Sequence, residues 1–229
     1  MADATSPEEK GFGQGDPALS AWAEKVFSPE DEVLREIRAR SIAAGLPAIA
    51  VGRFDGLHLE VLTRACKAKV AVEIGTLGGY SGVCLLRGLG EGGVLHTFEL
   101  AVKNAAVARE SFRKAGFEGR AVVHVGPAID NLRKLDSRLS IDLVFIDADK
   151  TGYPAYLDWA AERLAVGGVV LGDNAFGWGG VADLKAVRDD QHDSITALQE
   201  FNRRLATSGR FRATMLPTEE GLAMGVKVR

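Results

Sequence analysis

Two short runs in the chain end on side chains that could do chemistry. The apolar run Val144-Phe-Ile-Asp-Ala-Asp-Lys150 stops on two carboxylates and an amine, and Gly168-Val-Val-Leu-Gly-Asp-Asn174 stops on a carboxylate and an amide. Apolar runs bounded in this way are typical of buried parallel strands, which deliver functional groups at their carboxyl ends. If the two strands are neighbours, Asp147, Asp173 and Asn174 converge.

These three residues form a set of hard oxygen donors with no His or Cys nearby. Such a set suits Mg²⁺, Ca²⁺ or Mn²⁺ better than Zn²⁺ or copper. The alternative is that strand-end Asp and Asn residues only cap the helices that follow. Lys150 could serve as a base, or it could form a salt bridge to Asp149 or Asp147.

A second candidate site is the glycine-rich turn between Glu73 and Ser81. Glycines there would let the backbone approach a ligand closely, and Glu73 would place a carboxylate beside a cationic part of that ligand. The turn does not supply the G-x-G-x-x-G spacing of a dinucleotide fingerprint, because Thr76 and Leu77 stand between Gly75 and Gly78. Glu99 ends the next strand, where an acid can accept hydrogen bonds from both hydroxyls of a ribose. A nucleoside ligand is therefore predicted.

Strand-like and helical patterns alternate regularly from Lys69 onward, which predicts a parallel sheet covered on both faces. A short connection at 217–221 joins the last two strands and predicts an antiparallel hairpin. The expected fold is α/β, with a mostly parallel sheet of seven strands and one reversed strand. The strands are expected at about 69–74, 93–98, 120–125, 141–147, 167–172, 210–216 and 222–228.

Ahead of this alternation, residues 1–15 are polar and aperiodic and are expected to be mobile, and 16–55 are expected to form a helical extension. Ser28 and Asp55 are predicted to cap the second and third helices. A further helix is expected at about 181–190. Since no Pro/Ser-rich linker divides the 229 residues, we expect a single domain over 1–229.

The composition narrows the function classes. With 46% hydrophobic and 26% charged residues the chain is typical of a globular protein, and its net charge of −3 without a basic run predicts no nucleic-acid partner. No apolar stretch approaches the ~18 residues of a membrane span, so no membrane association is expected. Cys66 and Cys84 form no CxxC pair, which favours free thiols and a cytoplasmic location.

Taken together, these motifs resemble the cation-dependent class I S-adenosylmethionine O-methyltransferases, the family of the catechol and caffeoyl-coenzyme A O-methyltransferases. The resemblance runs from about Gly56 to the C-terminus. It depends on Glu73-Ile-Gly-Thr-Leu-Gly-Gly-Tyr-Ser81, Phe98-Glu99, Phe145-Ile-Asp-Ala-Asp-Lys150 with Tyr153, and Gly172-Asp-Asn174. It implies a Rossmann-like class I methyltransferase fold with extra N-terminal helices.

The resemblance also implies a role for each matching position. The divalent cation would be held by Asp147, Asp173 and Asn174, and Lys150 would be the catalytic base, assisted by Asp147. S-adenosyl-L-methionine would contact residues on four strand ends: Glu73, Gly75, Thr76, Leu77, Ser81, Glu99, Leu100, Gly126, Ala128, Asp147 and Asp149. Among these, Glu99 would bind the ribose, Ser81 the methionine carboxylate, and the turn of Gly126 and Ala128 the adenine.

The sequence thus predicts a cation-dependent O-methyltransferase acting on a catechol-like or caffeoyl-type phenol. Binding of a divalent ion to a phenolic oxygen would offset the roughly 4 kcal/mol needed to ionise a group with a pKa near ~10 at neutral pH. An NAD-dependent oxidoreductase and a non-catalytic nucleoside-binding protein of the same fold are the alternatives. The apolar N-terminal helices and the resemblance together predict a homodimer.

Overall fold

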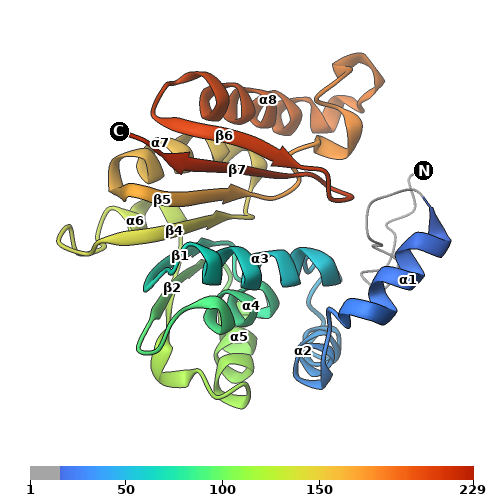
Figure 1. The fold of residues 1–229 in the computed structure, drawn as a ribbon, viewed down its shortest axis with the longest axis vertical. Coiled ribbons are helices and arrows are strands. Elements are labelled where there is room, and N and C mark those ends of the chain that lie inside the picture. Colours follow the sequence, from blue (N-terminus) through green and yellow to red (C-terminus); the bar gives the residue numbers. More distant parts are fainter. Residues whose placement is uncertain (1–15) are drawn as a thin grey trace.

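A seven-stranded sheet runs through the molecule (Figure 1), and the computed structural model describes residues 16–229 of the chain. The prediction for residues 1–15 lies outside the described part. The strand order is β3-β2-β1-β4-β5-β7-β6, and β7 is antiparallel to both of its neighbours. The predicted sheet with one reversed strand is therefore confirmed. The strands are β1 (Val70–Ile74), β2 (Val94–Glu99), β3 (Ala121–Val125), β4 (Ile141–Ile146), β5 (Leu164–Gly172), β6 (Phe211–Leu216) and β7 (Leu222–Lys227).

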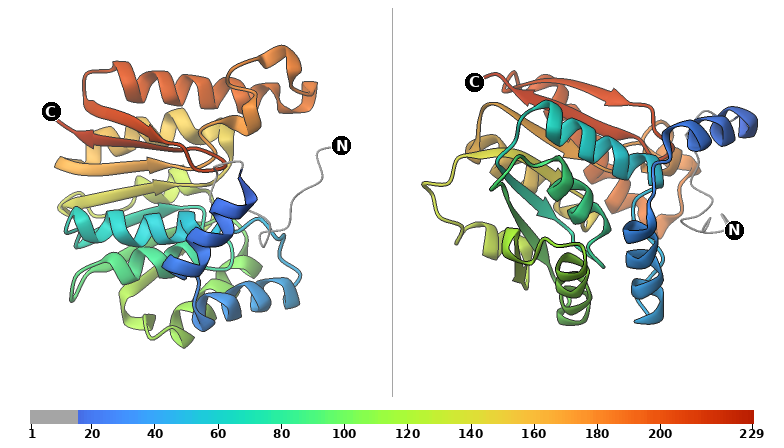
Figure 2. Two further views of the ribbon diagram at one scale, coloured as in Figure 1. Left: turned by 45° about the vertical axis from the view of Figure 1, so that its right-hand side comes forward. Right: turned by 60° about the horizontal axis from the view of Figure 1, so that its bottom comes forward.

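Helices cover both faces of this sheet (Figures 1 and 2). They are α1 (Pro17–Phe27), α2 (Glu32–Ala43), α3 (Arg53–Ala65), α4 (Tyr80–Gly88), α5 (Val102–Lys114), α6 (Ala128–Leu132), α7 (Tyr153–Arg163) and α8 (His192–Thr207). Successive side chains of β4 alternate between two apolar cores: Val144 and Ile146 pack toward α7 and α8, and Leu143 and Phe145 toward α3 and α4. A strand buried on both faces has to be apolar throughout, which explains the uninterrupted run in the sequence.

The predicted helix at 181–190 is wrong. The segment forms two short 3-10 turns, Leu184–Ala186 and Asp189–Gln191. Asp183 has an extended backbone and its side chain accepts a hydrogen bond from the Lys185 amide at 3.0 Å, which competes with helix formation. Most of the segment is exposed, so no continuous apolar face supports a helix.

Two predicted helix caps are also wrong. Asp31 caps α2 by accepting from the Leu34 amide at 3.1 Å, whereas Ser28 ends α1 with a positive φ of 44°. The N-cap of α3 is Gly52, and Asp55 lies inside its first turn, where it is buried. The pattern of polar residues thus located both helix starts only to within three residues, as is usual for element boundaries.

The topology shows where the connections between the strands diverge. Strand β1 lies between β2 and β4 in the sheet. The chain leaves β1 toward β2 and leaves β4 toward β5, so these two connections run in opposite directions. At such a switch point the loops diverge beyond the carboxyl ends of the strands and leave a crevice. The residues that follow β1, β2, β4 and β5 therefore meet at one edge of the sheet. No helix within residues 16–229 is long and apolar enough to span a membrane.

The packing of α8 against the strand ends yields a stability prediction. Phe201 is fully buried, its ring lies edge-on to Tyr153 with centroids 5.2 Å apart, and it fills the space left by Gly172. We expect Phe201→Ala to lower the free energy of unfolding by about 3–5 kcal/mol, since it opens a cavity in the core. Urea unfolding measures this. Val166→Ala, at a side chain that is 70% exposed, is the control and should change it by less than about 0.5 kcal/mol; equal losses in both variants would contradict the prediction.

Candidate functional site

Asp147 and Asp173 lie side by side at the carboxyl edge of the sheet. Ile146 and Gly172 are paired across β4 and β5, so the two aspartates follow at equivalent positions. Their backbones are fixed by the neighbouring strands: the Asp147 amide donates to Ile74 at 2.8 Å, and the Asp173 amide donates to Ile146 at 3.0 Å. The predicted convergence of these two strand ends is confirmed.

Burial gives Asp173 an unusual electrostatic state. The side chain is only 3% exposed, and burial, followed by the negative charges of Asp147, Asp55 and Glu220, holds the pKa of Asp173 well above its usual range. Its Oδ1 atom accepts no hydrogen bond from any described residue. Two carboxylates that repel each other, one of them with an unsatisfied buried oxygen, fit a cation as the missing partner.

Lys150 is held beside this carboxylate pair by two contacts. Its Nζ donates to Asp147 Oδ1 at 3.0 Å and to Tyr153 Oη at 2.8 Å. The Tyr153 hydroxyl lies 3.1 Å from the carbonyl oxygens of both Ile146 and Asp173, so it donates toward the backbone and accepts from the amine. Tyr153 thus fixes the position of Lys150, a role that no pattern in the sequence indicated.

Asn174 adds an amide to the edge. Its backbone is left-handed, with a φ of 54°, a conformation that Asn adopts more readily than most residues. Its Nδ2 donates to Glu220 Oε2 at 2.5 Å, which leaves the amide oxygen for another partner. Within residues 16–229 no three His, Cys, Asp or Glu side chains form a metal cluster, so any cation here would depend on the Asn174 amide as well as the two aspartates.

The glycine turn after β1 touches the same strand end. Gly75 has a φ of 100°, and a Cβ there would lie 2.0 Å from the Asp147 carbonyl oxygen. Only glycine fits this approach, as the sequence suggested. Two residues further on, the Leu77 amide donates to Glu99 Oε2 at 2.8 Å, which joins the turn to the end of β2.

Glu99 is buried at the end of β2 and is held in place by two backbone amides and one side-chain amide. Besides the Leu77 contact, its Oε1 accepts from the Ala101 amide at 2.9 Å and from Asn104 Nδ2 at 3.2 Å. The Gly126 amide donates to the Glu99 carbonyl at 2.9 Å, which places the start of α6 next to it. Of the other predicted cofactor contacts, Leu100 is highly exposed, Ala128 is the first residue of α6, and Asp149 accepts from Tyr156 Oη at 2.6 Å.

Glu73 is fully buried beneath the turn, where two hydroxyls contact it. Ser81 Oγ donates to Oε1 and Thr97 Oγ1 donates to Oε2, each at 2.6 Å. Thr97 also forms a very short hydrogen bond with Thr76. Burial raises the pKa of Glu73 to about 8, although the two hydroxyls act in the opposite direction. Glu73 and Ser81, each predicted to meet the cofactor, thus contact each other, and their roles toward a ligand stay predictions.

A cavity of about 470 Å³ adjoins the strand ends. It lies between the segment that follows Asn174 and the loop that joins β6 to β7, which are connected by hydrogen bonds from the Ala175 and Phe176 amides to Gly221 and Glu220. The lining residues are Phe176, Trp178, Gly179, Val181, Ala182, Glu219 and Glu220. The sequence analysis named the two aromatic residues but not the glutamates. The residues of a hairpin loop do not indicate which other segment of the chain the loop will contact.

The sheet topology and the groups at its carboxyl edge define a class I methyltransferase. The chain belongs to the O-methyltransferase family, whose family model matches residues 24–228. The catechol O-methyltransferase of Mycobacterium tuberculosis is 39% identical over 181 residues, which cover 79% of this chain and 80% of that protein. The catechol O-methyltransferase of Niastella koreensis is 34% identical over 201 residues, covering 87% and 89%. The crystal structure of the O-methyltransferase from Bacillus cereus in complex with SAH superposes with a TM-score of 0.84 at 34% identity, covering 92% and 97%.

The raised pKa of Glu73 leads to a pH prediction. Between about 4.5, the ordinary pKa of a Glu carboxyl, and about 8 the folded protein holds a proton that the unfolded chain has lost. The contribution to the free energy of unfolding is therefore complete below about pH 4.5 and falls as the pH rises, by up to about 1.4 kcal/mol per pH unit, until it levels off above about pH 8. Glu73→Gln cannot titrate, so its stability relative to wild type should improve steadily from pH 5 to pH 8.

Urea unfolding of both proteins at each pH measures this difference. Glu162→Gln, an exposed change on α7, removes the same charge without touching the buried network and should run parallel to wild type. Parallel curves for Glu73→Gln and wild type would show that Glu73 titrates normally.

Proposed function

We propose that this protein transfers the methyl group of S-adenosyl-L-methionine to a hydroxyl group of a catechol-like small molecule, with the help of a divalent cation. The observation that carries the proposal is the meeting of Asp147, Lys150 and Asp173 at the carboxyl ends of β4 and β5, next to a cavity. Membership of the O-methyltransferase family and the catechol O-methyltransferases among the relatives support the reaction and the class of acceptor.

Asp147, Asp173 and the Asn174 amide oxygen would hold the cation. The two close carboxylates, the unsatisfied Oδ1 of Asp173 and the all-oxygen donor set support Mg²⁺, Ca²⁺ or Mn²⁺. A cation bound there supplies Lewis acidity, which favours the ionised form of a phenolic oxygen. Three protein ligands would leave positions open for both oxygens of a vicinal diol.

Lys150 would take the proton of the acceptor hydroxyl. Its Nζ is positioned by Asp147 and by Tyr153 Oη rather than free to rotate, so a hydroxyl bound beside Asp147 would meet the amine at a defined place. The amine can act as a base only in its neutral form. Asp147 would therefore contribute both to cation binding and to the orientation of the base.

The cofactor would occupy the crevice between the ends of β1 and β2. Glu99 is already oriented by three donors and has acidic oxygens at the strand end, where a ribose would bind. Gly75, Thr76 and Leu77 would present backbone to the methionine portion, and Gly126 and Ala128 would border the adenine. Holding the two reactants in line would lower the entropic cost of the transfer. The relative from Bacillus cereus, crystallised in complex with SAH, supports S-adenosyl-L-methionine as the cofactor.

Membership of the O-methyltransferase family favours methyl transfer over the NAD-dependent alternative, and the glycine turn lacks the dinucleotide spacing. The intact group of Asp147, Lys150, Asp173 and Asn174 weighs against a non-catalytic nucleoside-binding protein. A cytoplasmic location and the single-domain division, with an N-terminal extension over 16–55, stay predictions.

The first test is the formation of S-adenosylhomocysteine from catechol, caffeate, caffeoyl-coenzyme A and a catechol-bearing flavonoid, each with Mg²⁺ and with EDTA. We expect turnover of at least one acceptor and its loss in EDTA. Asp147→Ala should lower kcat at least 100-fold while the Kd for S-adenosyl-L-methionine, measured by calorimetry, stays within a few-fold. Glu162→Gln serves as the control. Turnover that is indifferent to EDTA, or unchanged in Asp147→Ala, would contradict the cation mechanism.

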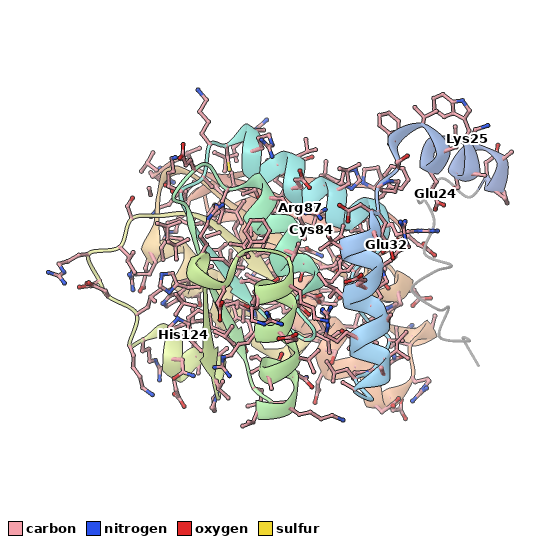
Figure 3. All side chains as sticks on the ribbon, turned by 90° about the horizontal axis from the view of Figure 1, so that it is seen from below. Glu24, Lys25, Glu32, Cys84, Arg87 and His124 are labelled. Atoms are coloured by element: carbon pink, nitrogen blue, oxygen red, sulfur yellow. The ribbon has the colours of Figure 1, made fainter. Side chains whose placement is uncertain are left out.

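The N-terminal helix supports the proposed homodimer. Helix α1 stands out from the body, as the position of Glu24 and Lys25 in Figure 3 shows, and it is attached through an ion pair between Glu24 and Arg53 at 2.9 Å. Its exposed apolar side chains are Leu19, Trp22, Val26 and Phe27. Such a cluster is typical of an interface. Light scattering should give about twice the 24.4 kDa of one chain, and a monomeric mass would refute the dimer.

A further inference from the structure

A second cavity, of about 310 Å³, lies beside β2 and β3, and none of its lining residues belongs to the candidate site described above. It is bounded by these two strands and by the segment that begins in α6. Since α6 has only five residues, it leaves part of the two strands uncovered. The lining residues are His96, His124, Asn131, Lys134, Leu135, Asp136 and Leu139.

Two histidines meet on the wall of this cavity. His96 Nδ1 and His124 Nε2 are 3.2 Å apart, the ring centroids are 5.5 Å apart, and the ring planes differ by only 23°. The two nitrogens therefore meet edge to edge, and one ring donates a hydrogen bond to the lone pair of the other. His124, which is labelled in Figure 3, also stacks on the buried Phe98 with centroids 4.5 Å apart.

The protonation state of this pair suits a metal ion. Burial lowers the pKa of both imidazoles, and the neighbouring His96 adds to the effect at His124. Both rings are therefore neutral at neutral pH, and neutral imidazole is the form that binds a metal. An ion would take the place of the shared proton once each ring had turned toward the cavity, so that both lone pairs pointed at it.

The distance between the two nitrogens also suits one ion. Bonds from Zn²⁺ to imidazole nitrogen are about 2.0–2.1 Å long, so two nitrogens 3.2 Å apart would subtend an angle of about 100° at the ion, near the roughly 109° of a tetrahedral site. Within the described part of the chain no third His, Cys, Asp or Glu completes the group. Waters in the cavity would therefore fill the remaining positions.

The charges around the cavity neither exclude nor replace such an ion. Lys134 and Asp136 are both exposed and have opposite signs, so their effects on a cation largely offset each other. Asp136 is already paired with Arg138 at 2.9 Å. Imidazole nitrogen favours Zn²⁺, Cu²⁺ and Ni²⁺, whereas Mg²⁺ and Ca²⁺ prefer oxygen donors.

We propose that His96 and His124 form a second metal site, which binds a divalent transition-metal ion such as Zn²⁺ and is separate from the strand ends of β4 and β5. An ion there would cross-link β2 with β3, which is an edge strand of the sheet. These strands lead to Glu99 and Gly126, whose backbones are hydrogen-bonded at 2.9 Å. The site would thus stabilise the strands below the predicted cofactor crevice. This inference does not depend on the proposed methyltransferase function.

The test measures Zn²⁺ binding to the untagged full chain by calorimetry, in excess Mg²⁺ to occupy hard oxygen donors elsewhere. We expect one Zn²⁺ ion per chain to depend on the histidine pair. His96→Gln and His124→Gln each remove one of the two ligands and should weaken binding at least about tenfold. His192→Gln is the matched control, because it removes a half-exposed histidine at the start of α8, and binding should stay within about twofold.

Two further readouts use the same proteins. Zn²⁺ should raise the Tm of the wild type and of His192→Gln but not that of the two pair variants, because an ion that binds only the folded state stabilises it. In the wild type, Zn²⁺ should shift the imidazole NMR signals of His96 and His124 and leave those of His58 and His192 unchanged, whereas Ca²⁺ should shift none of the four. The NMR measurement needs no substitution, so it decides the question even if a variant does not fold.

Three outcomes would overturn the inference. These are a wild type that binds no Zn²⁺ in excess Mg²⁺, pair variants that keep the wild-type affinity, and an equal loss of affinity in His192→Gln. Unchanged imidazole signals of His96 and His124 in the presence of Zn²⁺ would overturn it as well. Each of these outcomes leaves the methyltransferase assignment standing, because methyl transfer is measured separately with the acceptor panel.

Discussion

The repulsion between Asp147 and Asp173 is the constraint on which the rest of the site depends. The register of β4 and β5 places both carboxylates at one edge, and burial of Asp173 removes the water that would screen them. Backbone hydrogen bonds of a buried sheet stabilise this arrangement, because neither aspartate can move without disrupting the strand ends. Lys150 offsets part of the charge at 3.0 Å, and a cation would offset the remainder. The sheet thus maintains an electrostatic imbalance that a bound ion would relieve.

A second constraint joins this pair to the predicted cofactor crevice. Gly75 approaches the Asp147 carbonyl so closely that no side chain fits, and the turn then continues to the Leu77 amide, which donates to Glu99. The turn therefore contacts the strand end that carries Asp147 as well as the one that carries Glu99. A displacement of the turn would move both sites together, which suits a reaction that needs two reactants in line. The buried Glu73 supports the turn from below through Ser81 and Thr97.

The sequence predicted the features that depend on local residue patterns. Uninterrupted apolar runs located the strands, and the residues that follow them located Asp147, Lys150, Asp173 and Asn174. It failed where tertiary contacts decide: Asp55 looked like a cap but is buried near Asp173, and Tyr153 was noticed without a role although it positions Lys150. The helix expected at 181–190 failed because Asp183 bonds to its own backbone. The place of Glu219 and Glu220 on the cavity wall could not be predicted, because it depends on which segment the hairpin loop faces.

The strand ends of β4 and β5 and the wall of the neighbouring cavity carry acidic side chains in different surroundings. At the strand ends Asp173 is buried and Asp147 is half-buried, and both follow residues that are paired across β4 and β5. On the wall of the neighbouring cavity Glu219 is exposed and Glu220 is partly buried. The first arrangement is built into the sheet, whose register cannot shift without exposing the core. The second lies in loops, which can change without cost to the fold. The positions of Asp147 and Asp173 therefore depend on the packing of the sheet, whereas the shape of the cavity wall depends on the loops that form it.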